Sequence, residues 1–394
     1  MAKILVCDDD KEIVEAIEIY LSQEGHQILK LLDNEDGTYT LFVKKIKEDF
    51  IMSKFKYSVG PWNVHEGADA YGPATRETID LEEKIKTFAE MGFDAIQFHD
   101  DDAVPNMNEL SEGEVVSEAK ALKAMLDKYN LKAEFVAPRL WMDPHTVDGG
   151  FTSNSDEDRE FALWRAYRSI DIANALGCDK IVLWLAREGT ICFESKSPVE
   201  STKKLIDAIN KMLAYDKNIK IMIETKPNEP IDRSVCPTLG HAMAISATSD
   251  DPSRVGGLLE SAHAMLAGLD PANEIGFALA MGKLWGVHLN DQNGMKFDQD
   301  KSFGVENLRT AFNQMKVLME NGFGNNGEYI GLDVKVMRTE KQSGSYKHLE
   351  NSLKIAKMLE EKVNKFDYDF QKKCVAERDY EALEMYVMEL LMKG

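Results

Sequence analysis

Hydrophobic runs of five or six residues recur along the chain from residue 55 onward, each bounded by turn-forming or charged residues. Such runs predict buried strands. Eight are expected, at 55–59, 94–98, 132–137, 180–185, 220–224, 255–260, 284–289 and 329–334. Stretches with helical spacing separate several of them, at 81–92, 117–129, 158–177 and 305–322. Eight strands that mostly alternate with helices predict an α/β fold, the (β/α)8 TIM barrel.

Polar side chains follow five of these strands at the point where each strand ends. They are His99, Glu224, Glu260, His288 and Asp333. A single one of them would most simply be a hydrogen-bonded buried group. In a TIM barrel, however, the carboxyl ends of all strands meet at one face, which is where the active site lies. Five polar residues at that face therefore predict a functional site.

The chain is expected to have three parts. Residues 55–340 form the catalytic barrel, and residues 341–394 continue as a charged helical tail without further strands. A tail with regularly spaced apolar positions packs on the outside of the barrel or on a neighbouring subunit, so we expect an oligomer. Residues 1–50 form a short βαβ-like fragment.

This N-terminal fragment resembles the start of a response-regulator receiver domain. The resemblance covers an opening strand, a helix and a second strand, with Asp8 and Asp9 where that family keeps metal-binding acids. It stops near residue 32, and ~35 residues cannot build the five-stranded core of such a domain. We therefore expect residues 1–50 to be a fused fragment without a signalling role.

Composition narrows the class of partner. The formal net charge of −21 opposes binding to nucleic acid or anionic lipid, whereas small neutral substrates and metal cations fit it. No apolar run is long enough for a transmembrane helix and the first residues do not resemble a secretory signal, so a cytoplasmic protein is expected. The five cysteines lack C-x-x-C spacing, which argues against a zinc ribbon and favours reduced thiols.

Several motifs carry a family resemblance. They are FHDDD (98–102), DGGFTSN (148–154), IETKPNEP (223–230), LLESAHAMLAGL (258–269) and VHLNDQNGMKFDQD (287–300). With these motifs in this order, the chain resembles the xylose isomerase family, also called glucose isomerases, from about residue 55 to at least 340. The acid-rich 287–300 segment also has a physical meaning of its own, because so many buried acids need bound cations to compensate them.

The resemblance implies two divalent cations per subunit, Mg²⁺, Mn²⁺ or Co²⁺, and a hydride shift between C1 and C2 of an open-chain aldose. The reaction would convert D-xylose to D-xylulose, or D-glucose to D-fructose. Glu224, Glu260 and Asp333 match ligands of the first cation. His263, Asp298 and Asp300 match ligands of the second, with Glu260 shared. Hard cations prefer carboxylate oxygen, and two adjacent cations need a bridging acid.

The resemblance also assigns the groups that act on the sugar. Lys226 matches the lysine that polarises O1, His99 the histidine that opens the ring, and Asp102 the acid that orients this histidine. Trp141 and Trp184 match aromatic residues that line the sugar pocket. Tyr71 falls where the family has a phenylalanine that reaches into the neighbouring subunit's site, and a homotetramer is implied.

Two positions depart from the family pattern. His288 stands where the family has an aspartate ligand of the first cation, and a softer nitrogen donor should shift preference from Mg²⁺ toward Mn²⁺ or Co²⁺. Arg139 stands where the family has a small polar residue. It would either bind an anionic or highly oxidised sugar or form a surface salt bridge.

Three functions are compatible with this sequence. The first is an aldose–ketose isomerase acting on a pentose or hexose. The second is a related isomerase, epimerase or lyase acting on a modified sugar. The third, of another class, is a catalytically weak metal-binding regulatory protein, suggested by the N-terminal fragment and by His288.

We predict that His288→Asp strengthens Mg²⁺-supported activity relative to Mn²⁺-supported activity, because a carboxylate is a harder ligand than an imidazole. Activity measured with each cation in turn checks this prediction. An unchanged preference would show that His288 does not coordinate the first cation.

Overall fold

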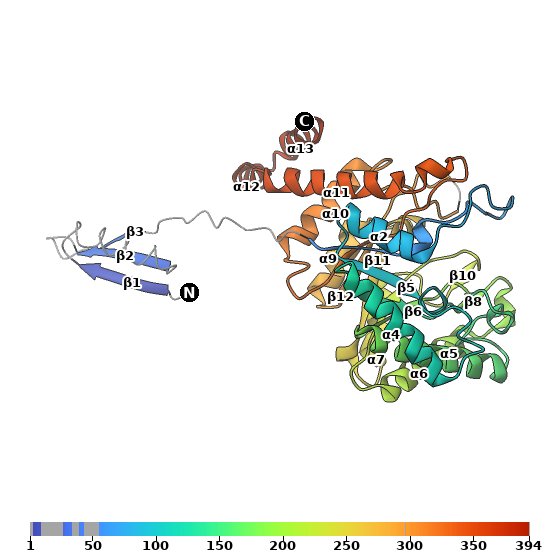
Figure 1. Cartoon of the computed structure of the whole chain (residues 1–394). Helices are drawn as coiled ribbons and strands as arrows, with labels where there is room; N and C mark the ends of the chain where they lie inside the picture. The colour runs from blue at the N-terminus through green and yellow to red at the C-terminus, as the bar shows by residue number, and fades with distance from the viewer. Residues whose placement is uncertain (1–2, 9–26, 34–38, 43–54, 296, 394) are drawn as a thin grey trace. The chain divides into compact units, whose positions relative to one another are not determined.

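The computed structural model describes residues 3–8, 27–33, 39–42, 55–295 and 297–393. The chain divides into two compact units, Met1–Met52 and Ser53–Gly394 (Figure 1).

The first unit contains a three-stranded sheet. Strand β1 (Lys3–Asp8) pairs in parallel with β2 (Gln27–Asp33), and β2 pairs antiparallel with β3 (Tyr39–Phe42). The parallel pair agrees with the expected βαβ-like fragment. Asp9 and the helix expected between the two strands lie outside the described residues. The resemblance to a receiver domain stays a prediction.

The second unit is built on a closed barrel of parallel strands, and the eight predicted strands are confirmed. They are β4 (Tyr57–Val59), β5 (Ala95–His99), β6 (Lys132–Ala137), β7 (Lys180–Trp184), β9 (Lys220–Glu224), β11 (Val255–Glu260), β12 (Leu284–Leu289) and β13 (Ile330–Leu332). Around the barrel they follow the chain order, and β13 closes on β4. All of their carboxyl ends therefore meet at one mouth.

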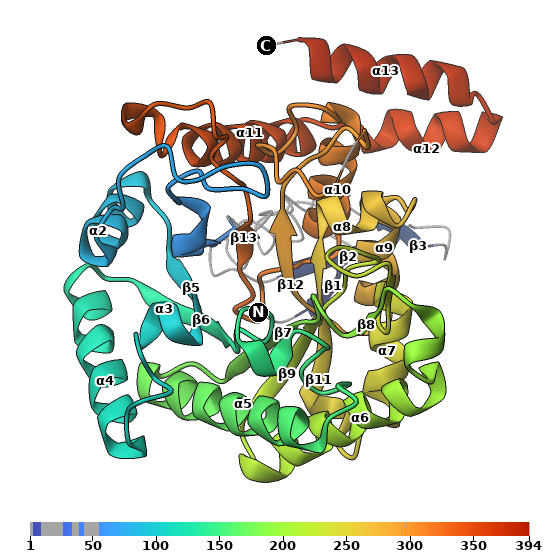
Figure 2. The ribbon, with the colours of Figure 1, turned by 90° about the vertical axis from the view of Figure 1, so that its right-hand side faces the viewer.

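Helices surround this barrel (Figure 2). The larger ones are α2 (Leu81–Met91), α4 (Glu112–Lys128), α5 (Asp156–Leu176), α6 (Pro198–Tyr215), α7 (Leu239–Thr248), α9 (Pro271–Ala280), α10 (Leu308–Glu320) and α11 (Lys347–Asn364). Two short helices, α3 (Asp100–Ala103) and α8 (Ser261–Leu266), directly follow β5 and β11 at the mouth. A small antiparallel pair, β8 (Gly189–Thr190) and β10 (Arg233–Ser234), links two loops.

Local sequence explains where the helices begin and end. Asp80 caps the amide of Glu82 at the start of α2, and Gly92 ends this helix with a φ of 88° that favours glycine. Ser111 and Glu114 form a reciprocal capping box at the start of α4. The four predicted helices agree with α2, α4, α5 and α10 to within a few residues at each end.

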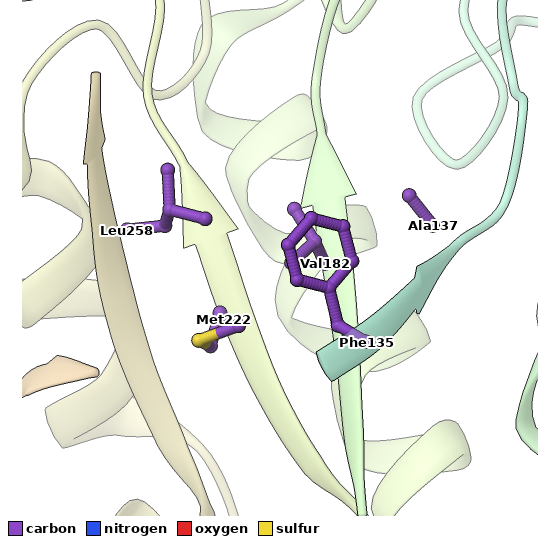
Figure 3. Close-up of a cluster of buried hydrophobic side chains, with 5 residues drawn as sticks. All are labelled: Phe135, Ala137, Val182, Met222 and Leu258. Atoms are coloured by element: carbon purple, nitrogen blue, oxygen red, sulfur yellow. The ribbon is translucent and has the colours of Figure 1, made fainter. Parts of the chain in front are cut away.

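Apolar side chains from neighbouring strands fill the barrel interior. Phe135, Ala137, Val182, Met222 and Leu258 form one buried cluster (Figure 3). They come from β6, β7, β9 and β11, so this cluster joins half of the barrel strands and supports the mouth above it.

The C-terminal tail consists of α11, α12 (Tyr368–Glu377) and α13 (Tyr380–Met392). Helix α11 buries Leu349, Leu353 and Ala356 and packs against α10, on the outside of the barrel. Helix α13 buries only Val387 and exposes Met385 and Met392. Among the described residues, no helix combines the length and apolar character required to cross a membrane.

We predict that Leu258→Ala lowers the free energy of unfolding by about 2–5 kcal/mol, because the substitution leaves a cavity in the barrel cluster. Urea denaturation followed by tryptophan fluorescence checks this, since all five tryptophans lie in the second unit. The matched control is Leu308→Ala, whose side chain is 43% exposed and whose loss should matter little. Equal effects of the two substitutions would contradict the assigned core.

Candidate metal and sugar site

A cavity of about 220 Å³ opens at the carboxyl ends of the barrel strands. Its wall contains acids, imidazoles and aromatic rings. The lining residues are Trp62, His99, Phe135, Ala137, Arg139, Trp141, Trp184, Glu224, Glu260, His263, His288, Asp298, Asp300 and Asp333. Most of the residues predicted from the sequence as a site are thus brought to one cavity. Lys226, Asp102 and Tyr71 do not line it.

One group of potential cation ligands comprises Glu224, Glu260, His288 and Asp333. One ligand atom from each lies within 4.8 Å of the others. His288 Nδ1 is 3.5 Å from Glu224 Oε1 and 3.6 Å from Asp333 Oδ2. The first three residues end or nearly end β9, β11 and β12, and Asp333 directly follows β13. Four consecutive strands of the barrel therefore each supply one ligand atom.

A second group comprises Glu260, His263 and Asp298, also within 4.8 Å of one another. His263, on α8, lies one helical turn after Glu260, with Nδ1 3.2 Å from Glu260 Oε2. Its Nε2 lies 3.0 Å from Asp298 Oδ2. Glu260 is thus shared by both groups, as the family resemblance implies.

Asp300 lies in the cavity wall but not in the second group. Its carboxylate pairs with Lys335 Nζ at 2.9 Å and accepts a hydrogen bond from Asn290 Nδ2 at 3.2 Å. The Lys335 ammonium and the Asp300 carboxylate attract each other because they carry opposite charges. Asp300 as a cation ligand stays a prediction.

The acids of the site influence each other's protonation. Burial and the neighbouring acids, Asp298 first, raise the pKa of Glu260 well above its usual range. Burial opposes ionisation of Glu224, but His288 holds its pKa below the usual range. Burial alone would lower the pKa of His288, whereas Glu224 and then Asp333 raise it to about 9. Without a bound cation, ionisation of Glu260 is therefore unfavourable.

The donor set fits divalent cations. His263 Nδ1, His288 Nδ1 and Asp298 Oδ1 are buried and have no hydrogen-bond partner among the residues that the structure describes. Buried polar atoms are normally satisfied, and carboxylate oxygens with imidazole nitrogens suit Mn²⁺, Co²⁺ and similar ions. Cations at the two groups would satisfy these atoms and remove the charge repulsion around Glu260.

Lys226 is buried beside two residues that line the cavity, Asp298 and Trp184. Its Nζ lies 3.0 Å from Asp298 Oδ2, 3.2 Å from Glu229 Oε2 and 5.2 Å from the centre of the Trp184 ring. Burial would lower the pKa of Lys226, but Asp298 and Glu229 raise it above its usual range. Lys226 is therefore a charged donor, and it cannot act as a base.

His99 is held from one side by two charged residues. Its Nδ1 lies 2.9 Å from Asp102 Oδ2 and 2.9 Å from Arg139 Nη2. Burial opposes ionisation of Asp102, but His99 and then Arg139 lower its pKa. Arg139 also pairs with Asp101 at 2.6 Å and Asp102 at 3.0 Å. Arg139 thus forms a salt bridge in the cavity wall and not on the surface, and its binding of an anionic sugar stays a prediction.

Aromatic rings cover the side of the cavity around His99. Ring centres are 4.4 Å apart for Trp62 and His99, 5.2 Å for His99 and Trp141, and 4.5 Å for Trp141 and Trp184. Tyr71 lies elsewhere: its side chain is 82% exposed and stacks on Phe297. An inserted role in a neighbouring subunit's site stays a prediction for Tyr71.

Three residues with contacts in this site were not predicted from the sequence, namely Trp62, Asn290 and Lys335. Trp62 donates from Nε1 to Asp333 Oδ1 at 2.9 Å, and Asn290 donates to Glu260 Oε1 at 2.7 Å. Lys335 pairs with Asp300. Trp62 and Lys335 each come three residues after the end of a strand, β4 and β13, so the strand-end rule could have found them. Asn290 lies inside the quoted 287–300 motif and carries no charge to single it out.

Comparison with known proteins agrees with this architecture. Similar solved structures include 3-keto-D-glucoside 4-epimerase from E. coli, with 17% identity and a TM-score of 0.55 over 77% of this chain and 100% of that chain. D-psicose 3-epimerase from Clostridium cellulolyticum H10 has 12% identity and a TM-score of 0.56 over 77% and 99% of the two chains. A D-tagatose 3-epimerase-like protein has 18% identity and a TM-score of 0.58 over 78% and 99%.

At these identities, the solved structures establish a shared fold and leave the reaction open. The model of a known protein family, by contrast, matches residues 85–322 of the sequence, from within α2 to just past the end of α10. This match covers more than half of the chain. The protein therefore belongs to the xylose isomerase-like TIM barrel family.

Proposed function

We propose that this protein is a divalent-cation-dependent sugar isomerase that interconverts an aldose and its ketose by hydride transfer between C1 and C2. The observation that carries the proposal is the pair of ligand groups sharing Glu260 on the floor of a cavity walled by tryptophans. When bound, the two cations would supply Lewis-acid polarisation of the sugar oxygens.

The side chains at the cavity have different roles in the proposed isomerisation. His99 donates from Nδ1 to the Asp102 carboxylate, so its Nε2 is the nitrogen left to exchange a proton with the sugar's ring oxygen. Lys226 is held charged beside the cavity and, by a change of side-chain rotamer, donates to the oxygen on C1. Trp141 and Trp184 exclude water from the reacting carbons.

The distribution of acids supports hydride transfer over proton transfer. Moving a proton to or from carbon requires a positioned acid or base, and epimerisation by this route requires one on each face of the carbon. Among the cavity-lining carboxylates, Glu224, Glu260, Asp298 and Asp333 belong to the ligand groups. The remaining one, Asp300, is paired with Lys335. Among the described lining residues, every carboxylate thus belongs to a ligand group or to an ion pair.

The charges around the cavity support a neutral sugar as substrate. Arg139, the cation in the cavity wall, is already matched by Asp101 and Asp102. Lys226 and Lys335 are likewise matched by carboxylates. A sugar acid or phosphate would enter a site without an unpaired basic side chain among the described lining residues, in a protein of net charge −21.

Epimerisation of a keto sugar is the second candidate. It is supported by the fold shared with the D-psicose 3-epimerase and the 3-keto-D-glucoside 4-epimerase. The two candidates differ in the fate of a hydrogen atom, because hydride transfer keeps it on the sugar whereas proton transfer exchanges it with solvent.

We also propose that the protein is a homo-oligomer, in agreement with the family resemblance. The exposed ring of Tyr71 and the exposed methionines of α13 are the surfaces that support this proposal. The proposed reaction does not depend on it.

We predict that D-xylose or D-glucose, incubated in D₂O with Mg²⁺, Mn²⁺ or Co²⁺, yields the ketose without deuterium on C1. NMR of the product checks both identity and labelling. Lys226→Met should lower kcat by about 10²–10³-fold through the loss of its donor. The matched control is Lys220→Met at the opposite end of β9, which should keep activity. Deuterium on C1 of the ketose would overturn hydride transfer, and an epimer as product would overturn the isomerase in favour of the second candidate.

We further predict that the protein binds two Co²⁺ ions per chain, measured by calorimetric titration. Glu260→Gln should weaken both sites, because its carboxylate belongs to both groups, whereas Asp298→Asn should weaken only one. We expect losses of at least about 10-fold in affinity, the scale seen for groups that support a metal site. One site left unaffected by Glu260→Gln would show that the acid is not shared.

A further inference from the structure

A buried polar cluster lies inside the barrel, one inward-facing strand position below the residues that line the cavity. It takes no part in the proposed chemistry. Gln97, two residues before His99 on β5, donates from Nε2 to Ser58 Oγ and to Glu134 Oε2, at 3.0 Å each. The side chains of this Gln97 cluster (Ser58, Gln97 and Glu134) are 0–3% exposed. Buried polar groups cost free energy unless they are hydrogen-bonded, and the Oε1 atom of Gln97 has no partner among the described residues.

A register shift creates the cluster. Between β5 and β6, the single residue Gln97 faces two residues, Glu134 and Phe135. An extra residue in one strand redirects the side chains around it. Phe135 accordingly lines the cavity, while Glu134 bonds to Gln97.

Two buried atoms of neighbouring side chains in this region have no partner. Gln97 Oε1 and His288 Nε2 are both buried and make no hydrogen bond within the described part of the chain. Both side chains lie against Gly331 of β13, where an added Cβ would come 2.3 Å from Gln97 Nε2 and 2.7 Å from His288 Cδ2. Because Gly331 has no side chain, nothing from β13 separates the amide from the imidazole.

The orientation of His288 determines what its Nε2 needs. Nδ1 faces Glu224 and Asp333, the ligand group of the first cation. An imidazole that offers Nδ1 to a cation keeps its proton on Nε2, and this N–H usually has an acceptor. Gln97 already uses its NH₂ group on Ser58 and Glu134, so the atom that it offers His288 is the acceptor Oε1.

We propose that Gln97 is a positioning residue for His288: its Oε1 accepts the Nε2 proton through one buried water and so holds Nδ1 toward the first cation. Ser58 and Glu134 keep the amide from rotating, because a rotated amide would present its NH₂ group to the N–H of His288. The inference rests on the cation site of the proposed function but applies to whichever reaction that site performs.

A double-substitution cycle tests the assignment by Co²⁺ titration, followed by calorimetry and visible absorption. Gln97→Leu should lower the affinity of the first site by about 10–100-fold and leave the second site unchanged. In the His288→Asp background the same substitution should have no effect, because a carboxylate has no ring proton to place. The matched control Ser58→Ala keeps Oε1 and should cause a smaller loss. Equal losses in both backgrounds would mean a merely structural role and would overturn the proposal.

Nitrogen-15 NMR of the Zn²⁺-loaded wild-type protein supplies a test that needs no substitution. The expected spectrum shows His288 with its proton on Nε2, and a proton on Nδ1 would overturn the proposal. Failure of wild-type protein to bind Co²⁺ would remove the proposed function together with this inference. Normal binding with an unaffected Gln97→Leu variant would remove only the inference.

Discussion

Glu260 is buried at the mouth of the barrel among Glu224, Asp298, Asp300 and Asp333, and the rest of the site is organised around this repulsion. In the described part of the chain, no lysine or arginine forms an ion pair with it. Its closest polar partners are the Asn290 amide at 2.7 Å and His263 Nδ1 at 3.2 Å. A buried carboxylate with like charges around it is stable only when it is protonated or when a cation is bound. The parallel barrel creates this situation, because it brings the ends of four consecutive strands to the same place.

The basic side chains of the site are all engaged with other acids. Lys226 pairs with Asp298, Lys335 pairs with Asp300, and Arg139 pairs with the acids of α3. The cavity thus has a negative floor formed by acidic side chains. Its wall, formed by aromatic rings and by paired acidic and basic side chains, has no net charge. A negative floor attracts cations, whereas a neutral wall suits hydroxyl groups of an uncharged sugar.

Relatives with 12–18% identity share the barrel but carry names of sugar epimerases. A shared barrel allows several reactions, because the chemistry depends on a few side chains at the mouth. In this chain those side chains include the imidazole of His288, which lies in a group of potential cation ligands, and Trp62 as a donor to Asp333. They also include Arg139, which holds His99 from the side away from its Nε2.

The sequence by itself determined the eight strands, the main helices and the types of residue available at the mouth, because hydrophobic periodicity and chain order directly reflect a barrel built from successive units. Only the tertiary structure decided which side chains meet. It directs Asp300 to Lys335, Arg139 to Asp101 and Asp102, and Trp62 to Asp333. It also places Gln97 beside His288 across a glycine. Residues tens to hundreds of positions apart come together through strand register, a bulge and side-chain rotamers, and none of these leaves a periodic signal in the sequence.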